Sequence, residues 1–114
     1  SDEDSAVALE LSETATRLSA QSGYLWNTRA LVLARAGKWS ESLMAIDKAI
    51  DIDQGGSPSD WYIKAMALAG NGDKEAARQW FKKAESWRAS NSPNNSELRR
   101  QAKMAEMLLY PGDG

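Results

Sequence analysis

Two matching stretches decide the fold: WNTRALVLARAG at residues 26–37 and WYIKAMALAGNG at residues 61–72. They place tryptophan, alanine, leucine and glycine at the same relative positions. The pairs, each 35 residues apart, are Trp26 and Trp61, Ala30 and Ala65, Leu33 and Leu68, and Gly37 and Gly72. Self-similarity at such a period is the signature of a repeat architecture.

The repeat extends beyond these stretches. Lys48-Ala49 recurs as Lys83-Ala84, and Ala15 lies 34 residues before Ala49. Small alanines let paired helices approach closely, and glycine suits the turn between them. A hairpin of two helices cannot cover its own apolar face, so stacked neighbours must complete the core.

The spacing of apolar residues predicts helices along nearly the whole chain. No alternating pattern typical of a strand exceeds four residues. A first helix is expected near residues 5–20, with an apolar face of Val7, Leu11, Ala15 and Leu18. Ser57 is a suitable N-cap for the helix that follows the loop 54–58, with Pro58 at its first position. The predicted fold is all-α, an antiparallel stack of helix hairpins with a C-terminal capping helix.

These residues resemble the tetratricopeptide repeat (TPR), a helix pair of about 34 residues. Trp26-x3-Ala30-x2-Leu33-x3-Gly37 and Trp61-x3-Ala65-x2-Leu68-x3-Gly72 match the first half of its pattern, and Ala77-x3-Phe81-x2-Ala84 matches the second. Arg29 and Lys64 depart from it, since they stand where the family usually has leucine. The resemblance covers residues 6–90 and implies a superhelical stack.

The chain is also similar to TPR segments of large bacterial multidomain proteins that carry a Ser/Thr kinase or WD40 module, which implies a piece of a longer protein. The expected organisation divides the chain into six parts. They are a frayed or disordered start at 1–4, the second helix of a truncated repeat at 5–21, a first TPR at 22–54, a second TPR at 55–91, a capping helix at 92–110 and a tail at 111–114.

The composition disfavours an enzyme. The 114 residues include no histidine and no cysteine, which removes the imidazole base, the thiolate nucleophile and the commonest metal ligands. We therefore expect no catalytic residue, no metal and no cofactor.

No apolar run approaches the ~20 residues that span a bilayer. The acidic start Ser1-Asp2-Glu3-Asp4 is unlike a signal peptide, so the expected location is the cytoplasm and no membrane partner is expected.

The TPR resemblance implies a concave groove lined by the first helix of each pair. Its expected lining residues are Tyr24, Asn27, Leu31, Arg35, Ser59, Tyr62 and Met66. An extended or helical peptide could dock there, so the expected function is non-catalytic protein–protein interaction, with an unidentified protein or peptide partner or a second copy of the chain. The alternative left open is that neighbouring repeats cover the groove.

A second functional alternative rests on charge. Residues 1–60 hold 5 basic and 10 acidic residues, whereas residues 61–114 hold 9 basic and 6 acidic. A basic face is expected at Arg78, Lys82, Lys83, Arg99, Arg100 and Lys103. It would suit a nucleic acid or an acidic ligand, but a solvated helix face is the favoured interpretation because no dense basic stripe is present.

Overall fold

A computed structural model describes residues 2–112, and within this range the chain is helical with no strand. The described helices are α1 (Asp2–Leu18), α2 (Gly23–Arg35), α3 (Trp39–Ile52), α4 (Pro58–Gly70), α5 (Lys74–Asn91) and α6 (Ser96–Leu109). The all-α prediction is confirmed for the described part of the chain.

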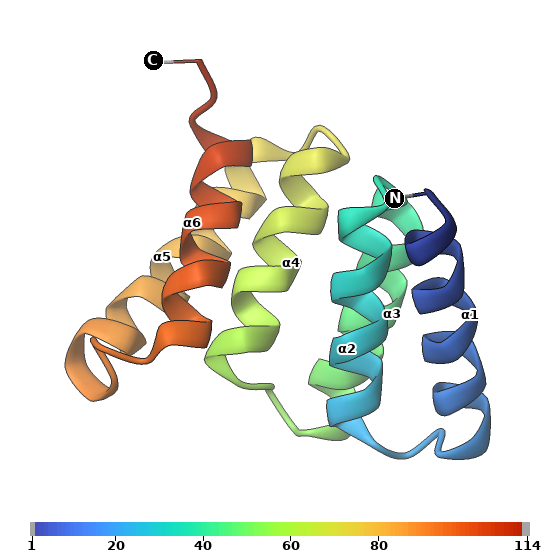
Figure 1. Ribbon diagram of the computed structural model, residues 1–114. Coiled ribbons are helices and arrows are strands. Elements are labelled where there is room, and N and C mark those ends of the chain that lie inside the picture. Colours follow the sequence, from blue (N-terminus) through green and yellow to red (C-terminus); the bar gives the residue numbers. More distant parts are fainter. Residues whose placement is uncertain (1, 113–114) are drawn as a thin grey trace.

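Consecutive helices run antiparallel and pack as neighbours (Figure 1). Helices α2 and α3 form one hairpin, and α4 and α5 form another. Helix α1 packs on α2, and the two hairpins meet through α2, α3 and α4. Helix α6 lies along α4 and also touches α5. In Figure 1, α2, α4 and α6 therefore lie side by side on one face, with α4 in the middle.

The repeat seen in the sequence recurs in the contacts of its two tryptophans. The indole Nε1 of Trp26 donates to the carbonyl oxygen of Ala20 at 2.8 Å. The indole of Trp61 donates to the carbonyl of Gly55 at the same distance. Each tryptophan thus ties its helix to the loop residue six positions earlier, so the two side chains occupy matching surroundings.

The turns inside the two hairpins also match. The backbone N–H of Lys38 donates to Leu33, and that of Asp73 donates to Leu68, both at 2.9 Å. Gly37 and Gly72, which precede these donors, have φ angles of 75° and 95°. Glycine adopts this left-handed conformation at no steric cost, which confirms the predicted role of both glycines in ending a helix.

The hydrophobic core centres on α4, which buries eight of its 13 residues. The repeated alanines are enclosed where helices meet: Ala30, Ala49, Ala65 and Ala84 are all fully buried. Burial of this kind is the main stabilising contribution in a domain of this size.

The structure corrects two expectations about the N-terminal part. Helix α1 begins at Asp2, so residues 2–4 are helical and not a frayed start, while Ser1 lies outside the described residues. Three residues of the predicted apolar face of α1 point outward, since Val7, Leu11 and Leu18 are 55%, 64% and 80% exposed, whereas Ala15 is half-buried. Helix α1 packs on α2 with the side that buries Ser12 and Thr16 and carries the half-buried Leu9.

Polar residues can fill that interface because their hydrogen bonds are satisfied locally. The hydroxyl of Thr16 donates to backbone carbonyls of its own helix and accepts from Nη1 of Arg29 at 3.0 Å.

At the other end of the chain, α6 ends at Leu109, within the predicted 92–110. Of the predicted tail, residues 113–114 lie outside the described residues.

Gly70, the last residue of α4, provides a test of how tightly the two hairpins meet. A Cβ atom at this position would collide with the indole ring of Trp39. Glycine-to-alanine changes in exposed helices usually stabilise by about 1 kcal/mol. We predict that Gly70→Ala instead lowers the free energy of unfolding by about 1–3 kcal/mol, as overpacking does, measured by urea denaturation.

The control for this prediction is the same change in a Trp39→Ala background, where the ring is gone. There Gly70→Ala should be neutral or stabilising. A stabilising effect of Gly70→Ala in the otherwise unchanged chain would contradict the observed contact.

Candidate functional site

The face formed by α2, α4 and α6 carries the residues that the sequence predicted for a groove. Tyr24 and Arg35 are exposed on α2, while Asn27, Leu31 and Ser59 are half-buried. Tyr62 and Met66 are fully buried. The predicted residues thus share one face, but Tyr62 and Met66 of α4 lie beneath its surface.

The burial of Tyr62 and Met66 is a correction. Tyr62 packs its ring against Phe81 of α5 and bonds to Glu85 and Arg88 of the same helix. Helix α6 also packs lengthwise on α4, so little of α4 stays open. These two residues are covered by α5 and α6 of the chain itself and not by a neighbouring repeat. Neither can serve as a freely accessible peptide contact.

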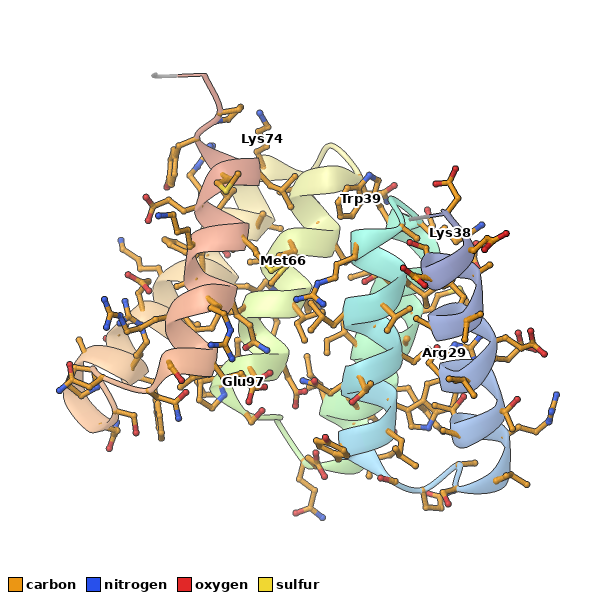
Figure 2. The ribbon with its side chains drawn as sticks, viewed as in Figure 1. Arg29, Lys38, Trp39, Met66, Lys74 and Glu97 are labelled. Carbon is orange, nitrogen blue, oxygen red and sulfur yellow. The ribbon has the colours of Figure 1, made fainter. Side chains whose placement is uncertain are left out.

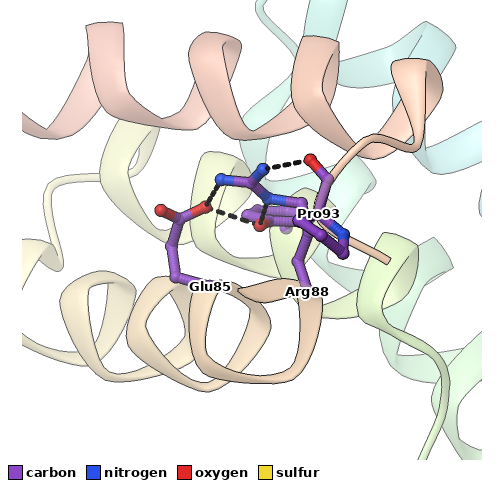
Figure 3. A network of polar contacts seen from close by, with 4 residues as sticks. Glu85, Arg88 and Pro93 are labelled. Atoms are coloured by element: carbon purple, nitrogen blue, oxygen red, sulfur yellow. Dashed lines mark hydrogen bonds and ion pairs between the residues drawn. The ribbon is translucent and has the colours of Figure 1, made fainter. Parts of the chain in front are cut away.

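Tyr62 belongs to a polar network that joins α4, α5 and the α5–α6 loop (Figure 3). Its hydroxyl donates to Oε1 of Glu85 at 2.6 Å and accepts from Nε of Arg88 at 2.9 Å. Arg88 also donates to Glu85 at 2.9 Å and to the carbonyl of Pro93 at 3.2 Å. Burial, followed by the hydrogen bond to Glu85, raises the pKa of Tyr62 to about 12. The network links α4 and α5 to the loop that precedes α6.

Two hollows remain on the face of α2, α4 and α6. The first, which we call the acidic hollow, has a volume of about 220 Å³. It lies where α2, α4 and α6 all begin. The side chains that matter for its chemistry are Tyr24, Asn27, Asp53, Ser59, Asp60 and Glu97.

Asp60 anchors the floor of the acidic hollow. Its carboxylate accepts from the backbone N–H of Ser57 at 3.0 Å, and Ser57 accepts from the Asp60 N–H, which completes a capping box at the start of α4. The predicted cap at Ser57 is confirmed. Burial raises the pKa of Asp60 above its ordinary value, and the nearby charge of Asp53 contributes in the same direction.

Asn27 has a different role from the one expected. Its amide nitrogen donates to Oδ1 of Asp60 at 2.6 Å and to the hydroxyl of Ser59 at 3.1 Å. Both N–H groups are therefore directed at the protein and are not free for a peptide. Asn27 instead joins α2 to α4 and holds the Asp60 carboxylate in place.

The second hollow, which we call the methionine hollow, lies where α2 and α6 end and has a volume of about 400 Å³. Its main lining residues are Arg35, Trp39, Met66, Met104, Met107 and Leu108. Figure 2 places Trp39, Met66 and Glu97 in order along this face. Methionine adapts its shape easily, which suits a surface that receives apolar side chains.

The two hollows are separated by a similar length of helix on both walls. On α2 the step runs from Asn27 to Ala34, and on α6 from Glu97 to Met104, seven residues in each case. Seven residues of α-helix span about 10 Å. We call the two hollows together the α2–α6 face.

The groove residues predicted from the sequence did not include several residues that line this face. Asp53, Asp60 and Glu97 come from three separate segments, and Met104, Met107 and Leu108 belong to the helix expected only to cap the stack. The α6 residues could have been predicted from their spacing. Positions 104, 107 and 108 form a second apolar stripe on this helix, beside the stripe that is buried.

The structure places the predicted basic residues against several different features of α5 and α6. Lys83 lies over the rings of Trp61 and Trp80, at 4.4 and 5.2 Å from their centroids. Arg78 pairs with Glu75 at 3.1 Å and lines a hollow with Lys82 and Glu85. A separate hollow on α6 is lined by Arg99, Arg100 and Lys103, together with Ser96.

Two further properties bear on function. Among residues 2–112, no group of three acidic or other metal-ligating side chains is arranged to hold a metal ion. Within the same range, none of the helices combines the length and apolar character that crossing a membrane requires.

The Tyr62 network predicts how stability depends on alkaline pH. The folded phenol keeps its proton up to about pH 12, whereas the phenol of the unfolded chain, with the ordinary pKa of 10.0, loses it earlier. The folded state therefore binds more protons between these values, and the free energy of unfolding should fall as pH rises from 10 to 12. Urea denaturation at several pH values measures this fall.

The matched variant is Tyr62→Phe, in which this contribution to the fall should disappear. The near-ultraviolet absorbance of tyrosinate should also lose its component near pH 12. An unchanged late component in Tyr62→Phe would contradict the assignment to Tyr62.

Comparisons of this chain with family models, with curated proteins and with solved structures found no match. Its function has to be argued from its own residues and their arrangement.

Proposed function

We propose that this chain is a non-catalytic module of the TPR type that binds a peptide or protein segment on the α2–α6 face. The TPR assignment is supported by the 35-residue repeat of motif residues, indole hydrogen bonds and glycine turns. Repeat stacks of this kind use the surface between successive helices for binding.

Two of the departures from the TPR pattern, Arg29 and Lys64, are compatible with this proposal because both residues have structural roles. Arg29 lies over the Trp26 ring at 5.5 Å and donates to Thr16 of α1. Lys64, at the equivalent position, lies over Trp80 at 4.6 Å and pairs with Asp47 of α3 at 2.7 Å. Each cation links its helix to a neighbour, where leucine would do so by apolar packing.

The observation that carries the binding proposal is the pair of hollows on one face. The backbones of α2 and α6 do not approach each other closely in the described part of the chain, and α4 lies between them as a floor. The walls combine an apolar region with a polar one, which is typical of sites that both anchor and orient a ligand. Met107 is 65% exposed at the rim of this face.

The alternative, nucleic-acid or acidic-ligand binding through α5 and α6, receives less support. Lys83 and Arg78 are already engaged by aromatic rings and by Glu75. The cations that remain together, Arg99, Arg100 and Lys103, occupy one short stretch of α6. A steep decrease of affinity with salt would be the mark of that function.

The binding proposal is tested by selecting peptides from a random twelve-residue library against the purified chain. We expect peptides whose affinity falls about ten-fold or more, roughly 1.4 kcal/mol, when Met107→Glu places a charge in the methionine hollow. Fluorescence anisotropy with labelled peptides measures the affinity, and circular dichroism checks that the variant is folded.

The matched control is Met44→Glu. Met44 is 74% exposed and lines a different hollow with Trp26 and Glu41, so the same chemical change occurs away from the α2–α6 face. Affinity should be retained in this variant. Selection that yields no peptide, or only peptides insensitive to Met107→Glu, would overturn the proposed function.

A further inference from the structure

We propose that this chain forms a symmetric dimer in which α1 of one copy packs antiparallel against α1 of a second copy. The inference goes beyond the proposed function, because α1 lies at one edge of the stack, away from α6, and lines neither hollow of the α2–α6 face (Figure 1). It assigns a partner to an apolar side of α1 that the described part of the chain leaves open.

The first observation is an exposed apolar stripe on α1, formed by Val7, Leu11 and Leu18. Among the described helices, the backbone of α1 approaches closely only that of α2, whereas α3 and α5 each have two neighbouring helices. Helix α1 packs on α2 with the side that buries Ser12 and Thr16, so the stripe faces solvent. Large aliphatic side chains gathered on one exposed face indicate a surface that binds another protein.

The second observation is that this stripe has the spacing of a helix pair that is complementary to itself. Residues 7, 11, 14 and 18 are separated by steps of four, three and four, which is the spacing of the contact positions in paired helices. The pattern is the same in both directions along the helix. In an antiparallel pair, Val7 of one copy therefore lies opposite Leu18 of the other, and Leu11 lies opposite Thr14. A two-fold axis requires this reciprocity.

The third observation is the complementary charge on one flank of the stripe. Glu10 and Arg17 stand one position before Leu11 and Leu18, so they lie on the same side of it. In the antiparallel register, Glu10 of each copy lies beside Arg17 of the other, and the pair forms twice. Both side chains are exposed, and neither forms an ion pair with another described residue. Opposite charges at these flanking positions determine the partner and the orientation of paired helices.

The remaining residues of α1 agree with the antiparallel orientation. The other flank of the stripe carries Ala8 and Ala15, and small side chains at a contact let two helix axes approach closely. The first turn of α1, residues 2–4, is acidic. A parallel pair would bring two such turns together, whereas the antiparallel pair places them at opposite ends of the contact. Charge therefore favours the same orientation as the spacing of the stripe.

The small size of the contact predicts a weak dimer. Helix α1 has 17 residues and is therefore about 25 Å long. A single helix pair of this length should bury less than the roughly 1,200 Å² at which stable interfaces begin. We therefore expect monomer and dimer in equilibrium, with a dissociation constant of about 10–100 µM.

Sedimentation velocity of the purified chain, at concentrations below and above this value, tests the proposal. Leu11→Glu places a charge in the centre of the stripe and should weaken self-association about ten-fold or more. Because Leu11 is exposed, the helix content measured by circular dichroism should not change. A chain that stays monomeric well above the expected dissociation constant would overturn the proposal, and so would a dimer that tolerates Leu11→Glu.

Charge reversal tests the orientation of the pair. Glu10→Arg and Arg17→Glu, made singly, replace both attractions by repulsions and should each weaken the dimer about ten-fold. The double variant restores opposite charges in exchanged positions and should recover the original dissociation constant. The matched control is Glu13→Arg, the same change at an exposed residue of α1 outside the stripe, which should leave self-association unchanged. A double variant no stronger than the single ones, or an equal loss in the control, would overturn the antiparallel pair.

Discussion

The enclosure of α4 is the constraint on which the rest of the structure depends. A helix of 13 residues has little stability by itself, and α4 is apolar around much of its circumference. It becomes stable only because α2, α3, α5 and α6 all pack against it. The α2–α6 face is a consequence, since α2 and α6 cover neighbouring sides of α4 without meeting each other.

The fold could be predicted to the extent that the 35-residue period fixes local structure. Gly37 and Gly72 end their helices as predicted, and the equivalent tryptophans have equivalent partners. Helix α1 was predicted with the wrong buried side. Its stripe of Val7, Leu11 and Leu18 is more apolar than its packed side, and composition cannot show that Ser12 and Thr16 have their polar groups satisfied within the helix.

The candidate site could be predicted only in part, for a related reason. The periodicity placed Tyr24, Asn27, Arg35 and Ser59 on the face that carries the two hollows, because these positions lie off the packing stripe of their helices. It could not place α6. An amphipathic pattern shows that a helix has a side to bury, but it does not show which surface of the stack that side will cover. Tyr62 and Met66 were therefore expected to be open although both are buried beneath α5 and α6.

The acidic hollow could not be predicted from the sequence, and it shows how charge is distributed over the molecule. Its carboxylates stand at positions 53, 60 and 97, and no spacing along the chain encodes their meeting. The cations that could neutralise them are held elsewhere. Lys64 and Lys83 lie over tryptophan rings, Lys64 also pairs with Asp47 on the side of α3, and Arg88 is tied to Tyr62 and Glu85.

The same aromatic residues that build the repeats therefore draw positive charge toward α3 and α5. A cation over an indole face gains an electrostatic attraction, which favours these positions of Lys64 and Lys83. The net negative charge at the beginning of α2, α4 and α6 therefore results from how the repeats pack. The sequence contains basic residues, but packing places them elsewhere.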